Sequence, residues 1–192
     1  TYIADGHHRT STTALLHEAG KELYPRYDFD HLFCAFFAAD QLDILDYNRV
    51  VEGLDGISAP SFIVLLSHFF EMELLPVARR PTDKHEVVML LRKEWYSLRW
   101  KQSVLDNYPP DEVLLDANLL NELVMNKVFG ILDVRTDQRI IYVEGSKGLR
   151  GIQKQVGRSR LRVGFMLYPV TFDDMMRLAD LGESLPPKST YF

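Results

Sequence analysis

The sequence predicts a domain that combines strands with helices, of the α/β or the α+β class, with a mixed sheet and flanking helices. Short runs of β-branched and aromatic residues predict the strands, and segments with apolar residues at helical spacing separate them. Strands that alternate with helices argue against a helical bundle. The length of 192 residues fits one domain or at most two. Both ends lie in extended, apolar stretches, so we expect a piece of a longer protein.

The first elements are predicted as strand, turn, helix and second strand. Residues 2–4 read as a short apolar strand, and the Thr-Ser-Thr-Thr of residues 10–13 offers N-cap candidates for a helix through about Tyr24. Residues 31–39 form a continuous apolar run, which is typical of a strand buried on both faces. The single cysteine, Cys34, lies in this run. We therefore expect a core thiol rather than a nucleophile.

The middle of the chain contains an extended segment, a helix and a hairpin. Residues 44–51 are predicted to be extended, and Pro60 opens a helix. Its apolar positions are Phe62, Ile63, Leu66, Phe69 and Phe70. Residues 85–101 hold two apolar runs separated by a polar trio, which predicts a β-hairpin. The aromatic residues of the hairpin are expected to pack in it rather than stack on bases.

The last third alternates helix and strand. A helix from Asp116 to Gly130 carries five apolar residues on one face, Leu119, Leu120, Leu123, Val124 and Val128. Residues 140–143 are predicted as a strand, 146–155 as a helix and 161–168 as a strand. Thr171 and Asp174 have the spacing of a capping box for a last helix through Ala179.

Composition excludes several classes of protein. The net charge of -5 and the pI of about 5.7 argue against a surface that neutralises nucleic-acid phosphates. The basic run at 150–162 is expected to be a solvated helix and loop. One cysteine forms neither an intrachain disulfide nor a cysteine-based zinc site. No apolar run reaches the roughly 20 residues of a membrane span, and no signal-peptide pattern is seen, so we expect a cytoplasmic protein without a membrane partner.

Residues 5–9, Asp-Gly-His-His-Arg, are the most site-like stretch. They place a carboxylate, two imidazoles and a guanidinium on a glycine turn before a helix. The free N–H groups and the positive dipole end of that helix favour an anion such as phosphate. In this interpretation Gly6 lets the phosphate approach the backbone closely, and the forked guanidinium of Arg9 donates to the phosphate oxygens.

Three other interpretations of the turn remain open. A metal site needs Asp5 as a third ligand, because the adjacent imidazoles of His7 and His8 diverge. A nucleophilic site needs a histidine base within reach of Thr10 or Ser11. A polar turn that only caps the helix needs no ligand at all. We predict no metal site.

A strand followed by Asp-Gly-His-x-Arg and a helix is similar to the phosphate-binding motif of the ParB/sulfiredoxin-like superfamily. Its members include nucleotide-dependent enzymes, a free-serine kinase group and CTP-binding partition proteins. The resemblance covers about a dozen residues. It implies a ParB/sulfiredoxin-like element at the N-terminus, in which His7 or His8 and Arg9 contact nucleotide phosphates.

A second resemblance spans nearly the whole chain. Residues 3–9, the Leu-Asp at 115–116, residues 133–142 and residues 185–192 together look like the bacterial domain-of-unknown-function family 1015. Members are roughly twice this length, so the chain resembles their C-terminal half. Thr10 stands where a tyrosine is expected. Asp-Tyr-Asn-Arg at 46–49 replaces Pro-Thr-His-Arg, which loses a histidine but keeps Arg49. The family has no settled activity to carry over.

These observations predict a protein that binds a nucleotide or a phosphorylated metabolite. The leading prediction is a phosphotransferase acting on a small molecule, most concretely an amino-acid kinase that uses ATP or ADP with Mg²⁺. Its catalytic residues would be Asp5, His7 and His8, and its phosphate- or nucleotide-binding residues Gly6, Arg9, Thr10, Arg49 and Lys188. The alternative is a non-catalytic nucleotide-binding regulatory module. A DNA-directed or partition-like protein is disfavoured by the acidic charge, and the oligomeric state stays open.

One further polar pattern is expected to be structural. Asp133, Arg135, Asp137 and Arg139 alternate along the chain, and we predict ion pairs that close a turn. His17, His68 and His85 are expected at the surface or at an interface.

Overall fold

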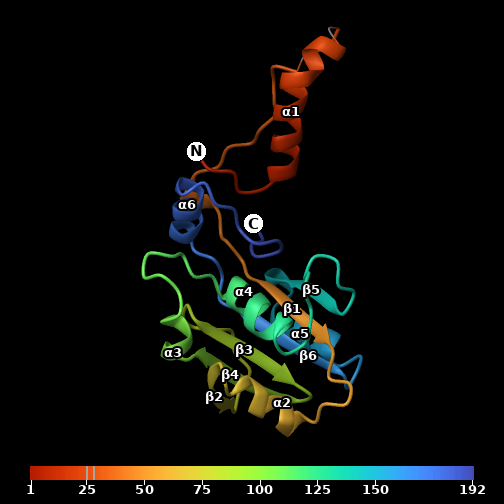
Figure 1. Cartoon of the computed structure of the whole chain (residues 1–192), viewed down its shortest axis with the longest axis vertical. Coiled ribbons are helices and arrows are strands. Elements are labelled where there is room, and N and C mark those ends of the chain that lie inside the picture. Colours follow the sequence, from red (N-terminus) through yellow and green to blue (C-terminus); the bar gives the residue numbers. More distant parts are fainter. Residues whose placement is uncertain (25, 28) are drawn as a thin grey trace. The chain divides into compact units, whose positions relative to one another are not determined.

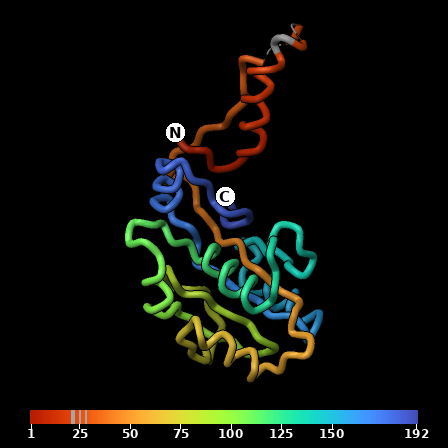
Figure 2. Tube along the Cα trace, viewed as in Figure 1, coloured from red at the N-terminus to blue at the C-terminus, as the bar shows by residue number. Residues whose placement is uncertain are grey.

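The computed structural model describes residues 1–24, 26–27 and 29–192 (Figure 1), and the course of the chain is traced in Figure 2. The chain forms two compact units. Unit 1 consists of residues 1–43 and Phe192, and unit 2 of residues 44–191. We describe each unit by itself.

Unit 1 is built on α1 (His7–Leu23) and the short 3₁₀ turn η1 (Ala39–Gln41). The helix begins at His7, three residues earlier than the Thr-rich stretch predicts, because Gly6 occupies the N-cap position with a left-handed φ of 90°. The Thr10 hydroxyl donates back to the Gly6 carbonyl at 3.2 Å, so this threonine stabilises the first turn from inside the helix. The strand predicted over residues 2–4 is wrong: these residues pair with no strand in the described part of the chain.

The strand predicted over residues 31–39 is also wrong. Residues 31–38 have no regular secondary structure and are exposed, and the Phe33 side chain is 98% exposed. Cys34 is exposed as well, so the expected core thiol is not found. A continuous apolar run becomes a buried strand only where neighbouring strands satisfy its backbone groups. In unit 1 the described residues supply no such neighbour.

Unit 2 contains one six-stranded sheet with the order β2-β4-β3-β6-β1-β5. The strands are β1 (Tyr47–Glu52), β2 (Phe70–Leu75), β3 (Glu86–Leu91), β4 (Glu94–Trp100), β5 (Ile140–Glu144) and β6 (Arg162–Leu167). The predicted combination of a sheet with flanking helices is confirmed. All described pairings are antiparallel rather than mixed, which favours the α+β class.

Helices α2 (Ala59–Leu66), α4 (Asp116–Leu119) and the π-helix η2 (Leu120–Asn126) pack on one face of this sheet, and α5 (Gly148–Val156) packs on the other. The remaining helical elements of unit 2 are α3 (Gln102–Leu105), the 3₁₀ turn η3 (Gly145–Lys147) and α6 (Phe172–Asp180). The predicted hairpin is confirmed as β3 and β4, and the predicted capping box is confirmed at Thr171 and Asp174. Phe70, predicted on a helix, starts β2 instead.

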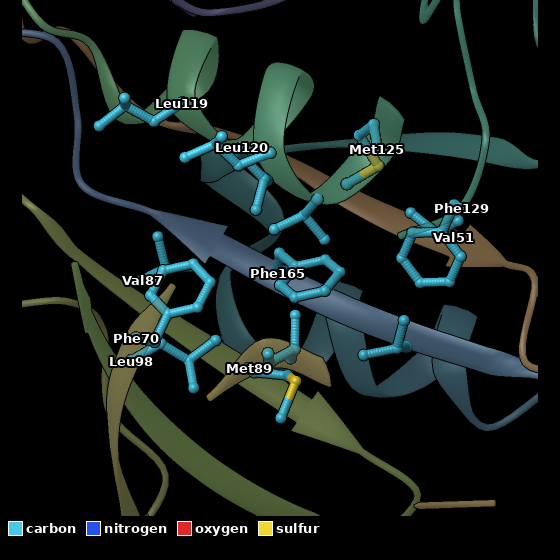
Figure 3. Packing of buried hydrophobic residues seen from close by; sticks show 14 of the residues in the cluster. Val51, Phe70, Val87, Met89, Leu98, Leu119, Leu120, Met125, Phe129 and Phe165 are labelled. Carbon is cyan, nitrogen blue, oxygen red and sulfur yellow. The ribbon is translucent and has the colours of Figure 1, made fainter. Parts of the chain in front are cut away.

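The larger core lies between the sheet and the segment formed by α2, α4 and η2. Phe165 and Met89 of the sheet belong to one buried cluster with Leu120 and Met125 of η2, and Figure 3 shows these residues. On the opposite face Ile152 and Val156 of α5 form a second buried cluster with strand residues such as Val50 and Val88. Because successive strand residues point to opposite faces, the odd-numbered residues of β1 belong to the α4–η2 face.

Candidate functional site

The Asp-Gly-His-His-Arg turn forms the start of α1. The carbonyl of Gly6 accepts from the backbone N–H of Thr10 at 2.9 Å, and no side chain caps the helix. The first N–H groups of an uncapped helix lack intrahelical acceptors and carry the positive end of the dipole. The backbone of the turn therefore has the donors that a phosphate needs.

The charged side chains of the turn pair with each other. Arg9 Nη2 lies 3.1 Å from Asp5 Oδ2, and the two side chains are 79% and 83% exposed. An exposed pair of this kind contributes little to stability. A bound anion could exchange for the carboxylate of Asp5 at little cost.

The two histidines of the turn, His7 and His8, are exposed residues at the first two positions of α1. Their exposure leaves both imidazoles accessible to a ligand or to a substrate proton. In the described part of the chain, no group of three His, Cys, Asp or Glu side chains gathers as a metal site would require.

The two remaining predicted site residues, Arg49 and Lys188, lie in unit 2, whereas Asp5 to Thr10 lie in unit 1. Arg49 is 0% exposed on β1. Its Nη1 donates to the Tyr47 carbonyl at 3.1 Å, and its Cζ lies 5.7 Å from the centre of the Tyr142 ring. Burial lowers the pKa of Arg49 to about 10, against an opposing effect of Tyr142.

Lys188 belongs to the same side-chain cluster. Its Nζ lies 5.2 Å from the centre of the Tyr47 ring, and the Tyr47 and Tyr142 rings are 6.0 Å apart, edge to face. Tyr191 contacts Tyr47 from another side at 6.3 Å. Unit 2 therefore brings Arg49 and Lys188 to one pair of tyrosine rings, an arrangement that the sequence did not indicate.

Unit 2 also contains a cavity of about 490 Å³, which sequence reasoning missed. Asn118, Asn121 and Asn126 of the α4–η2 segment line the cavity. Its lining also includes Val134, Pro186 and three acidic residues, Glu112, Glu122 and Asp133. The volume falls in the range of small-molecule sites. The signal in the sequence was the set of asparagines on the helix from Asp116, opposite its apolar face. A π-helix is rare and is frequently found at functional sites.

The other polar patterns have structural roles. Asp133 pairs with Arg135 at 3.4 Å and Asp137 with Arg139 at 2.6 Å, which confirms the predicted ion pairs. In the basic run, Arg162 is not simply solvated, because its Nη2 lies 2.8 Å from Glu52 Oε2. No helix in the described part of the chain is long and apolar enough to cross a membrane.

Several solved structures resemble this chain at low identity. A mutant free serine kinase in complex with AMP is 14% identical with a TM-score of 0.48, and a mutant in complex with ADP is 16% identical with a TM-score of 0.45. A conserved hypothetical protein from Pyrococcus furiosus is 15% identical with a TM-score of 0.46. Each alignment covers 98% of this chain, but 66%, 66% and 68% of the other chain. The chain thus spans about two thirds of their length, and TM-scores this low carry no argument about its chemistry.

No curated protein gives a significant match. The family described as "Protein of unknown function (DUF1015)" matches residues 1–134. This range includes the Asp-Gly-His-His-Arg turn and the Leu-Asp that opens α4, and it is more than half of the 192 residues. The chain therefore belongs to the DUF1015 family of proteins of unknown function.

Proposed function

We propose that the protein binds a nucleotide or a phosphorylated metabolite at the start of α1 and transfers a phosphoryl group to or from a small molecule. The observation that carries the proposal is the geometry of the turn. Gly6 has a left-handed φ of 90°, and the helix that follows is uncapped and presents exposed histidine and arginine side chains. Free N–H groups at a helix start together with a forked cation are a recurrent phosphate site.

The residues of the turn take separate roles in this proposal. The backbone N–H groups of residues 7–9 hold phosphate oxygens, and Arg9 neutralises their charge once it leaves Asp5. His7 or His8 accepts the proton of the attacking hydroxyl, because both imidazoles are exposed at the start of the helix and a ring nitrogen can act as a general base. Thr10 holds the first turn of the helix in place through its bond to Gly6.

ATP or ADP with Mg²⁺ is the cofactor that fits these residues. Mg²⁺ is usually held by one or two carboxylates together with phosphate oxygens, and the exposed Asp5 carboxylate is available for that purpose. When bound, the ion would neutralise negative charge on the transferred group. Arg49 and Lys188, which the sequence also predicts to bind phosphate, belong to unit 2 and are not assigned to the site at the start of α1.

Calorimetric titration of the whole chain with AMP, ADP and ATP, with and without Mg²⁺, tests the proposal. We expect Arg9→Gln to weaken nucleotide binding at least tenfold, which corresponds to about 1.4 kcal/mol. Arg26→Gln is the matched control, because Arg26 is an exposed arginine of unit 1 beyond the other end of α1. If none of the nucleotides binds, or if both variants bind as the wild type does, the proposed phosphate site is wrong.

Phosphoryl transfer is tested by incubation with radiolabelled ATP and a panel of free amino acids and other hydroxyl-bearing metabolites. We expect a labelled small molecule that is absent with the His7→Ala, His8→Ala double variant. Nucleotide binding without any labelled product in the whole panel would favour the alternative, a regulatory module that binds its ligand without chemistry.

A further inference from the structure

Arg49 is a buried cation without a counter-charge among the described residues. Within that part of the chain its Nη1 donates to the neutral carbonyl of Tyr47, and its Nε and Nη2 atoms are buried with no partner. A buried guanidinium normally binds a carboxylate or another strong acceptor, because removal of a charge from water costs several kcal/mol. Two nitrogens of a fully buried arginine, which carry three N–H groups, therefore lack an acceptor in the described part of the chain and point to an acceptor on a ligand.

A second cation, Lys188, lies over the ring of Tyr47, which contacts the Tyr142 ring beside Arg49. Lys188 makes no ion pair within the described residues, and its φ of 56° is left-handed, which is unusual for a residue with a side chain. With this backbone conformation, the ammonium group of Lys188 lies over the ring of Tyr47. The Tyr47 ring in turn contacts the ring of Tyr142. The neighbouring Lys147 is paired with Glu144 at 2.9 Å. The uncompensated local charge is therefore that of Arg49 and Lys188.

The cavity of unit 2 is lined by residues that neighbour each cation's surroundings. The Tyr142 hydroxyl donates to the Val134 carbonyl at 2.9 Å, and Val134 lines the cavity. Pro186 and Pro187, directly before Lys188, line it as well. Asn121 contributes a buried amide oxygen to which no group in the described part of the chain donates. Unused donors on Arg49 and an unused acceptor on Asn121 thus both belong to unit 2, with Tyr142 and Val134 between Arg49 and the cavity.

We propose that unit 2 contains a binding site for a phosphorylated small molecule, with the phosphate between Arg49 and Lys188 and the remaining polar part in the cavity beside Asn121. A phosphate monoester carries close to two negative charges at neutral pH and has three acceptor oxygens, which matches two cations and two free guanidinium donors. Lys188 supplies a point charge and Arg49 a planar donor pair. The oxygen of Asn121 accepts from a hydroxyl or amine of the ligand.

Tyr142 controls access to Arg49. It is partly exposed, it lies on the edge strand β5, and its ring covers the guanidinium. Rotation of this side chain would open the guanidinium to the ligand while the sheet stays intact. This site goes beyond the one proposed at the start of α1, because none of its residues belongs to unit 1.

The test uses ribose 5-phosphate and inorganic phosphate, titrated into the whole chain that carries Arg9→Gln, so that the turn of unit 1 does not contribute. We expect ribose 5-phosphate to bind, Lys188→Met to weaken binding at least tenfold, and Arg49→Met to abolish it. Lys154→Met is the control, because Lys154 is an exposed lysine of α5 on the opposite face of the sheet. Inorganic phosphate is expected to bind more weakly because it leaves the cavity empty.

A stability measurement separates a ligand-binding arginine from a structural one. We expect the urea midpoint of Arg49→Met to equal or exceed that of the parent chain, because a methionine of similar length removes an uncompensated charge. The inference is overturned if neither probe binds, or if Lys188→Met binds like the parent chain. It is also overturned if Arg49→Met lowers the midpoint while Lys188→Met leaves binding unchanged. Binding lost with Arg9→Gln alone would leave the turn as the site and reject this one.

Discussion

Arg49 and Tyr142 face each other across the β1–β5 ladder, with the guanidinium carbon 5.7 Å from the centre of the ring. Both residues lie on the face of the sheet that α4 and η2 cover. The ring gives the buried cation a favourable electrostatic surface, and the hydroxyl of the same tyrosine is fixed by the Val134 carbonyl. The contributions of the Tyr142 ring and of the Tyr142 hydroxyl to stability can therefore be measured separately.

We predict that Tyr142→Phe lowers the free energy of unfolding by about 1 kcal/mol, because it removes the hydrogen bond to Val134 and keeps the ring. Tyr142→Leu should cost about 1 kcal/mol more, because it also removes the cation–π contact with Arg49. Urea denaturation at pH 7 measures both values. Equal losses in the two variants would show that the ring contributes nothing to holding Arg49.

Glu86 should give the protein an acid-labile contact. Burial alone raises the pKa of Glu86, but hydrogen bonds from Arg79, Ser97 and Thr82 outweigh burial and hold the pKa at about 2. Arg79 Nη2 lies 2.6 Å from Glu86 Oε1, and the glutamate side chain is 0% exposed. Because the folded-state pKa is below the unfolded value of 4.5, the stabilisation is complete above pH 4.5 and is lost as the pH falls toward 2.

We therefore predict that Glu86→Gln costs about 3 kcal/mol at pH 7, because it leaves the charge of Arg79 without its partner. The variant should also lose less stability than the wild type between pH 4.5 and pH 2. Glu71→Gln is the control, since Glu71 is an exposed glutamate on β2 of the same sheet. Parallel pH profiles for wild type and Glu86→Gln in thermal unfolding would contradict the assignment.

The start of α1 depends on the left-handed backbone of Gly6. We predict that Gly6→Ala destabilises the helix by about 1 kcal/mol, because an L side chain disfavours a φ of 90°. The added Cβ would also lie 3.2 Å from Arg9 Nη2, a flexible atom that can move. Amide hydrogen exchange of α1 measures the effect. Ser11→Ala is the control: the α1 amides of this variant should be protected from exchange as well as those of the wild type or better, because alanine favours the helix.

Elements whose determinants are close in sequence were predictable. The capping box needs only Thr171 and Asp174, three residues apart, and the hairpin needs two apolar runs around a polar turn. The Asp116 network was not predictable. Its carboxylate accepts from the His85 backbone N–H at 3.0 Å and from Trp100 Nε1 at 3.0 Å, and these partners come from other elements. Only the fold decides that a histidine expected at the surface approaches a buried aspartate.

The site residues likewise divide into those that a local sequence pattern predicts and those whose surroundings only the fold determines. A local pattern was enough to single out the turn at residues 5–9, because a helix start is a property of neighbouring residues. The sequence gives no sign that Arg49 is buried without a partner, since Tyr142 and Lys188 follow it by about 90 and 140 residues along the chain. Likewise, an apolar helix face predicted the α4–η2 segment, but periodicity does not distinguish a π-helix from an α-helix.

Residues 31–39 show why an apolar run is not sufficient evidence for a core. Phe33 in this run is 98% exposed, whereas Phe165 on β6 is 0% exposed and lies in the larger core (Figure 3). We predict that Phe33→Ala changes the free energy of unfolding by less than about 0.5 kcal/mol, because no packing is lost. Phe165→Ala should cost about 3 to 5 kcal/mol, because it removes buried area and leaves a cavity. Urea denaturation of the two variants in parallel provides the measurement. A loss of several kcal/mol for Phe33→Ala would mean that this aromatic ring is buried in solution, as the apolar pattern alone had predicted.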